Sequence, residues 1–177
     1  LRRTKEVVLE AVRADAQVIS SVDESYRDDS DIIRACMREK KSKWNDKLYI
    51  TGSAYTYFGD EFKNDREVTL TMSKGVRFSL EVVPATFRSD REIVRNAIES
   101  DAMNFKYIPV SLQDDLDFVR TLYQANDNIL TYMDEALKKR LFTTSITTDE
   151  HRGRSVSIDL VLDDGIVNDR RRSASVV

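Results

Sequence analysis

The sequence has few of the residues from which catalytic and metal sites are usually built. Among 177 residues there are one histidine, one cysteine and five glycines. The histidine, His151, follows Asp149 and Glu150 in a polar segment that reads as a solvated turn, and no second cluster has the spacing of metal ligands. No glycine-rich phosphate cradle is present. We therefore expect no catalytic residue, no cofactor and no metal site in this fragment.

A single cysteine, Cys36, excludes an intrachain disulfide framework. Equivalent positions elsewhere in the chain are apolar, so we expect a buried, inert thiol. A free thiol is typical of a reducing intracellular compartment, the cytoplasm or the nucleus, although the sequence leaves an organelle open.

Long apolar runs are also missing. No segment approaches the roughly 18 apolar residues that a membrane-spanning helix needs, so we expect a soluble protein without a membrane span. The start, Leu1-Arg2-Arg3-Thr4, does not resemble a signal peptide, and its lack of methionine suggests a fragment of a longer protein. One third of the residues are charged, yet the net charge is only -3, which favours neither nucleic acid nor an anionic membrane as a partner of the whole chain.

What the sequence does contain is a repeat. Five similar units begin at Thr4, Asp29, Asp65, Asp90 and Asp115, whose spacings are 25, 36, 25 and 25 residues. Apolar residues recur seven positions before the next unit (Val22, Phe58, Val83, Ile108, Met133) and three positions before it (Tyr26, Phe62, Phe87, Leu112, Leu137). A period of this length indicates a stacked array of small units.

The first eleven residues of each unit have the apolar spacing of an amphipathic helix, as in Ile93, Val94, Ala97 and Ile98. We predict that the helices of the second to fifth units are capped by Asp28, Asn64, Ser89 and Asp114. At the third position after each of these four capping residues there is an acid: Asp31, Glu67, Glu92 and Asp117. The first unit has Arg3 at the capping position, so we expect it to lack the cap.

A second, shorter helix is predicted in the other half of each unit. Gly75, Asp101 and Asn126 are expected to break the first helix. Apolar residues at spacings of three and four follow, and Pro84 and Pro109 then end the second helix and start a turn. The predicted fold is mainly α: a short helical-repeat solenoid of about five 25-residue two-helix units over residues 1–141.

The units resemble a known family. Asp90-Arg-Glu-Ile-Val-Arg-Asn-Ala-Ile, followed by Phe105-Lys-Tyr-Ile-Pro and Leu112, is similar to the tandem "DREVVLAAV" repeats of the domain of unknown function 4116. The similarity covers about residues 4–140. It implies a helical array and is silent on chemistry, because the family has no assigned catalytic residues to carry over.

The second unit carries eleven extra residues, within an insertion near 38–53. Five cations surround the only tryptophan there: Arg38, Lys40, Lys41, Lys43 and Lys47 around Trp44. One interpretation is a contact patch for an acidic protein, with nucleic acid less favoured. The other is an elongated helix with a solvated basic face. The aromatic residues Tyr55 and Phe58, further on, are predicted to lie in the core.

The end of the chain differs from the array. Residues 142–169 alternate apolar and polar residues around glycine-containing turns, which predicts a small β-hairpin that caps the array or adds strands to a partner. Residues 170–177 form a basic tail. Its arginines lie two to four residues before Ser173 and Ser175, the pattern read by basophilic kinases. An unstructured basic tail is the alternative.

The sequence thus favours a non-catalytic helical-repeat scaffold or adaptor that binds other proteins, as a structural subunit of a larger complex. A second hypothesis is a regulatory or substrate-recruiting fragment of a larger enzyme or effector. A third, less favoured, is nucleic-acid binding through Lys40–Lys47.

Overall fold

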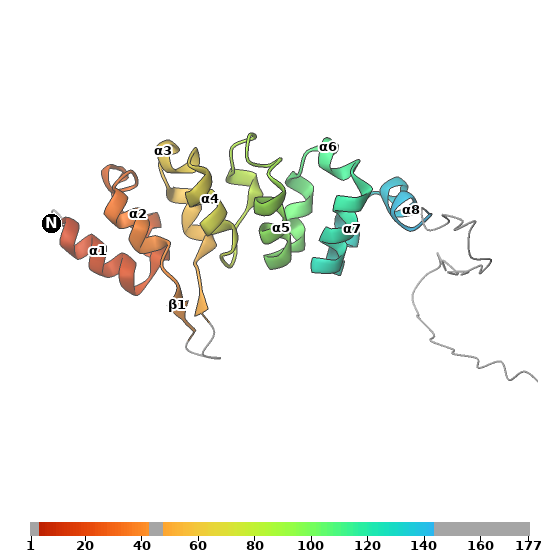
Figure 1. Ribbon diagram of the computed structural model, residues 1–177. Coiled ribbons are helices and arrows are strands. Elements are labelled where there is room, and N and C mark those ends of the chain that lie inside the picture. Colours follow the sequence, from red (N-terminus) through yellow and green to blue (C-terminus); the bar gives the residue numbers. More distant parts are fainter. Residues whose placement is uncertain (1–3, 43–47, 144–177) are drawn as a thin grey trace, which may run out of the picture. The chain divides into compact units, whose positions relative to one another are not determined.

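The computed structural model describes residues 4–42 and 48–143, and this part of the chain is mainly helical (Figure 1). One compact unit spans Leu1–Leu141, and a second unit begins at Phe142. Phe142 and Thr143 continue the helix α8 (Glu135–Thr143). The rest of the predicted hairpin at 142–169, and the tail at 170–177, lie outside the described residues.

An α-helix begins at the second residue of each of the five sequence units, as the apolar spacing predicts. These helices are α1 (Lys5–Ala14), α2 (Ser30–Cys36), α4 (Arg66–Ser73), α5 (Arg91–Ser100) and α7 (Leu116–Ala125). Each has one apolar stripe, which is buried in α5 by Ile93, Val94, Ala97 and Ile98.

The predicted capping residues are wrong by one position. The caps are the aspartates that open each unit, Asp29, Asp65, Asp90 and Asp115, whose carboxylates accept backbone N–H groups of the first turn. Asn64 and Asp114 instead end the short helices α3 (Asp60–Lys63) and α6 (Val110–Gln113) with near-helical backbone angles, which an N-cap cannot have. In the first unit Thr4 precedes the helix without a side-chain capping bond.

The second half of each unit is a 3₁₀ helix, and the two-helix prediction is too simple. These 3₁₀ helices are η1 (Ala16–Ser21), η3 (Gly52–Tyr57), η4 (Leu80–Val82), η5 (Ala102–Tyr107) and η6 (Asp127–Tyr132). The first unit has a further short one, η2 (Glu24–Tyr26). Apolar spacings of three match the three residues per turn of this helix. After η3, η5 and η6 a third helical piece follows: α3, α6 or α8.

Asp101 and Asn126 break the long helices, as predicted, and the geometry explains how. Each has an extended backbone, ends one helix, and accepts the N–H group two residues later as the cap of the next 3₁₀ helix. Asp15 acts in the same way between α1 and η1. The chain therefore turns sharply without a glycine.

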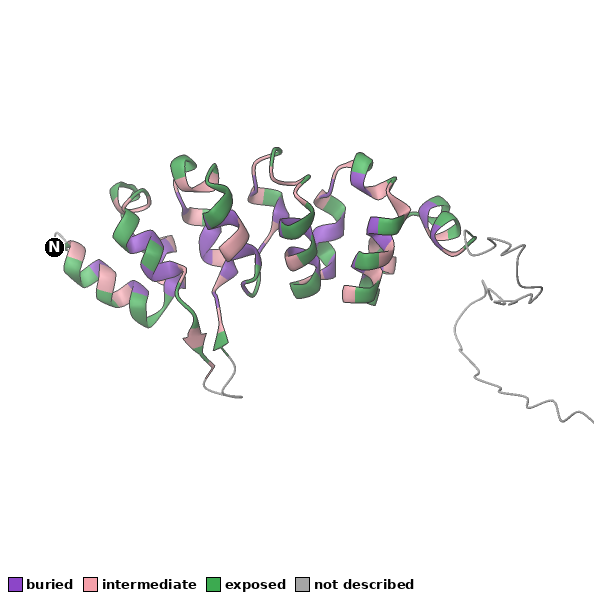
Figure 2. Ribbon diagram, in the orientation of Figure 1, coloured by how far each residue is buried: buried purple, intermediate pink, exposed green. Residues whose placement is uncertain are grey.

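The core follows the first predicted apolar column fully and the second in part. In the second column Leu112 and Leu137 are buried, whereas Tyr26, Phe62 and Phe87 are half-buried. All five residues seven positions before the next unit are buried and extended: Val22, Phe58, Val83, Ile108 and Met133. Proline follows only two of them, so proline is not required for this conformation. Figure 2 shows the buried residues where neighbouring helices meet. In η6 the buried residue is Ile129, and its neighbour Leu130 is half-buried.

Successive long helices pack against each other at three of the four joints between units: α1 on α2, α4 on α5, and α5 on α7. At each of these joints the first residue of one helix forms an ion pair with the capping aspartate of the next. The Lys5 Nζ atom lies 2.8 Å from Asp29, the Arg66 Nε atom lies 2.7 Å from Asp90, and Arg91 pairs with Asp115. At these three joints the capping carboxylate therefore also links its own unit to the preceding unit.

Buried polar groups add a second connection between units. The Asn104 side chain is buried; it donates to the carbonyls of Phe78 and Ala97 at 3.0 Å and accepts from the N–H group of Leu80 at 2.8 Å. Asn126 donates to the Ile98 carbonyl at 2.9 Å. These bonds fix the positions of η5 and η6 relative to the preceding unit, because breaking them would leave buried or half-buried polar groups unpaired.

The joint between the second and third units is built differently. Ser30 stands where the other joints have a cation, and α2 and α4 do not form a comparable packed pair. Gly52 and Gly75 approach here so closely that a Cβ atom on Gly75 would lie 2.6 Å from the Gly52 nitrogen. The tight contact explains why both positions are glycine.

We predict that the two roles of Asp90 can be separated by mutation. Asp90→Ala loses both the cap and the Arg66 pair and should reduce the free energy of unfolding by about 1–2 kcal/mol. Asp90→Asn keeps a capping oxygen but no charge, so it should cost less. Thr4→Ala is the control, because Thr4 forms no side-chain cap, and should have little effect in urea unfolding. Equal losses for all three variants would contradict this assignment.

The same aspartates predict a direction of pH dependence. The pKa of Asp29 is lowered by Lys5, and the pKa of Asp115 by the N–H group of Phe118 and by Arg91. For Asp90 burial acts upward, but Arg66 and the first-turn N–H groups outweigh it and the pKa falls. Stability from a lowered pKa is present above the unfolded value of about 4 and is lost as the pH falls through the folded value.

Thermal unfolding should therefore show a steady midpoint from pH 7 to about 5 and a decline below about pH 4. The midpoint of the Asp90→Asn variant should fall less between pH 5 and the acid end of this range than the midpoint of the parent chain. A midpoint that rises on acidification would contradict the assignment.

Candidate partner-binding ribbon

The insertion in the second unit forms a two-stranded antiparallel ribbon, not the elongated helix of one interpretation. β1 (Lys40–Lys41) pairs with β2 (Leu48–Tyr49), with Lys40 opposite Tyr49 and Lys41 opposite Leu48. Figure 1 shows both strands pointing away from the helices of the first compact unit. Residues 48–51, Leu-Tyr-Ile-Thr, have a high strand propensity, which is the local signal for this structure. We call residues 38–42 and 48–50 the ribbon.

Lys40 holds the ribbon to the first unit. Its Nζ atom donates to the Val12 carbonyl at 3.1 Å, in the last turn of α1. Carbonyls in a last helical turn lack partners within the helix, and a cation is favourable at that end of the helix dipole. Burial lowers the pKa of Lys40. Of the predicted contact residues, Lys40 therefore has a structural role within the chain.

The other end of the ribbon is held by the third unit. The carbonyl of Ile50, a buried residue, accepts the N–H group of Val76 at 2.8 Å. Thr51 and Val76 form a parallel bridge, and the Ser53 hydroxyl bonds the Gln17 side chain at 2.7 Å. The base of the ribbon is thus bonded to residues of the first and third units.

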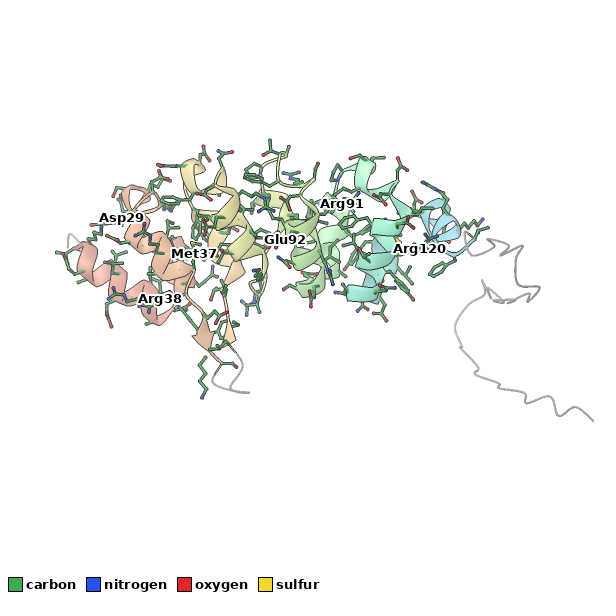
Figure 3. All side chains as sticks on the ribbon, in the orientation of Figure 1. Asp29, Met37, Arg38, Arg91, Glu92 and Arg120 are labelled. Carbon is green, nitrogen blue, oxygen red and sulfur yellow. The ribbon has the colours of Figure 1, made fainter. Side chains whose placement is uncertain are left out.

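Four described side chains are exposed around this fixed base. Arg38, Glu39 and Lys41 are exposed, and Leu48 has 64% of its surface accessible. Figure 3 places Arg38 where the end of α2 leads into β1. The ribbon therefore presents an apolar side chain together with two cations and one acid. The other predicted contact residues, Lys43, Trp44 and Lys47, lie outside the described residues, as do His151, Ser173 and Ser175.

The aromatic run behind the ribbon belongs to the core, as predicted. Tyr55 and Phe58 are buried, and the Tyr55 ring lies 5.7 Å from that of Phe58 and 5.2 Å from that of Phe78. The Tyr55 hydroxyl bonds the Lys63 carbonyl at 3.0 Å and the Thr69 hydroxyl at 2.9 Å. These side chains support the ribbon and do not extend its exposed surface.

Two features were missed by reasoning from the sequence. Leu48 was not singled out, although an apolar residue between charged ones in an insertion is a usable signal. The pairing role of Lys5, Arg66 and Arg91 was also missed, although a cation directly follows the opening residue in these three units. Both depend on which side chains meet across units, which the apolar columns do not specify.

The described ranges 4–42 and 48–143 contain no group of three or more histidine, cysteine, aspartate or glutamate side chains that could hold a metal ion. No helix in them is both long and apolar enough to cross a membrane. Cys36 is fully buried, and burial raises the pKa of its thiol to about 12.

We predict that Cys36 reacts with thiol reagents only after unfolding. The thiolate is the reactive form, and both burial and the raised pKa suppress it. At pH 8 a chromogenic disulfide reagent should release close to zero equivalents from the native protein and one equivalent in denaturant. Rapid stoichiometric reaction of the native protein would contradict a buried, inert thiol.

Comparison with known proteins places part of the chain in a family. Two overlapping segments, residues 71–113 and 90–138, match the family model described as Domain of unknown function (DUF4116). No curated protein and no solved structure matches the chain. The resemblance seen in the third and fourth units is thereby confirmed over residues 71–138. This segment belongs to the family of the domain of unknown function 4116.

Proposed function

We propose that residues 1–141 form a short helical-repeat solenoid that acts as a non-catalytic scaffold or adaptor, binding other proteins within a larger assembly. Two features support the solenoid: helices of successive units pack in sequence order at three joints, and ion pairs of one type recur there. Repeat arrays bury their regular columns between units and use irregular segments for binding.

The ribbon is the observation that carries the binding proposal. It interrupts the repeat, its base is bonded to two other units, and it exposes Leu48 at 64%. An exposed leucine has a cost in solvent that a partner surface removes, by about 25 cal/mol for each Å² of apolar area buried. A fixed base also reduces the entropy lost on binding.

The charge around Leu48 favours an acidic protein surface as the partner. Lys41 lies opposite Leu48 in the strand pairing and Arg38 is exposed at the base of the ribbon, and cations at the rim of an interface speed association with an acidic surface. An apolar contact at the centre with charges around it is the usual arrangement of a protein interface. Nucleic acid would use the cations but would gain little from Leu48.

Paired variants test this proposal. Leu48→Asp changes the ribbon, and Val110→Asp is its control in α6, because Val110 is equally exposed at 69% and far along the chain. In affinity capture from cells with quantitative mass spectrometry, Leu48→Asp should reduce a defined set of proteins at least about tenfold, the effect of 1.4 kcal/mol. Val110→Asp should leave this set unchanged.

A second pair tests the charges. Arg38→Glu should weaken the same set, whereas Arg95→Glu, an exposed arginine on α5, should not. Two results would contradict the proposal: both variants of each pair capture the parent set, or the purified chain binds RNA or DNA with a steep loss of affinity as salt rises.

A further inference from the structure

One column of the repeat is covered in every described unit except the first. The fourth residue of each unit is apolar: Val7, Ile32, Val68, Ile93 and Phe118. The last four have at most 8% of their surface exposed, whereas Val7 is 56% exposed. Four positions later, Ala11 is half-buried, while Cys36, Met72, Ala97 and Leu122 have no exposed surface. The α1 helix therefore has the apolar stripe of an internal helix, but this stripe is exposed at Val7, where the other helices bury it.

The joints at α2, α5 and α7 show what covers this stripe elsewhere. In each case the long helix of the preceding unit packs against the helix that carries the stripe. The cation at the start of that helix adds to the contact: the Arg91 guanidinium carbon lies 4.8 Å from the centre of the Phe118 ring. An apolar stripe and a cation in the first turn are thus the two features of a covering helix.

The acid in the first turn of the covered helix completes the pattern. Asp31 accepts Lys5 at 2.7 Å, and Glu92 accepts Arg66 at 3.2 Å, both across a joint. Glu6 occupies the same position in α1 and is exposed. α1 therefore has the acid and the apolar stripe with which α2 and α5 receive a preceding unit.

We propose that the exposed face of α1, formed by Glu6, Val7 and Ala11, receives a further helical unit of this repeat type. Its long helix runs in the same direction as α1, lays its apolar stripe on Val7 and Ala11, and pairs a first-turn lysine or arginine with Glu6. The interface continues the one already formed three times within residues 4–143. This proposal does not depend on the ribbon.

The last long helix of a second copy fits this face poorly. α7 begins with Leu116, where α1, α4 and α5 begin with Lys5, Arg66 and Arg91. A head-to-tail contact with α7 would leave Glu6 without a cation. A unit with a basic first residue has the required charge.

The test adds such a unit to the full chain. A copy of residues 65–89, whose Arg66 reaches the first-turn acid of the next helix, is inserted directly before Thr4 so that the 25-residue period is kept. The extended chain should unfold in one transition, with Tm raised by about 4 °C or more. Amide exchange in α1 should become slower. Replacing the copied arginine by leucine is the matched control and should reduce the gain.

Val7→Asp separates covering from general folding effects. In the parent chain the side chain is largely exposed, so the substitution should change Tm little. In the extended chain it should remove most of the gain. An added unit that unfolds separately or gives no gain in Tm would overturn the proposal. So would a parent chain that is a dimer by light scattering and becomes a monomer with Val7→Asp, because the occupant would then be a second copy.

Discussion

The structure depends on an aspartate that performs two tasks at once. At the start of α5, Asp90 caps its own helix and binds the arginine that begins the preceding long helix. An exposed ion pair alone contributes little to stability, because water and salt screen it. Here the carboxylate is already held in place by backbone N–H groups, so less side-chain freedom is lost when the arginine binds. At three of the four joints, the residue that starts a unit therefore also links it to the previous one.

The one joint without this aspartate–cation pair is also the place where the described repeat is irregular. The joint that lacks the cation, after Ser30, is the one that contains the ribbon. It is held instead by the close approach of Gly52 to Gly75 and by the bonds of Ile50 to the third unit. A joint without the regular connection can accept eleven extra residues, and these residues then become the most individual surface of the described chain.

Much of the helical structure could be predicted from spacing alone, because burial on one helix face leaves a strong periodic signal. The buried positions of Tyr55, Phe58 and Cys36 followed from it. The caps were misplaced by one residue because pairs such as Asp114 and Asp115 both contain good capping side chains, and only the backbone angles choose between them. The helical interpretation of the insertion failed because strand pairing and the Lys40 contact with α1 are long-range. The contact role of Arg38 and Lys41 remains a prediction.

The most direct test of this account is a double-mutant cycle at one joint, with Arg66→Gln, Asp90→Asn and their combination compared in urea unfolding at low and high salt. Both single variants keep polar side chains, and asparagine keeps the cap, so the cycle isolates the ion pair. The account predicts that the double variant loses less stability than the sum of the single variants, and that this difference shrinks at high salt. Strictly additive losses at low salt would contradict the claim that the capping aspartates connect successive units.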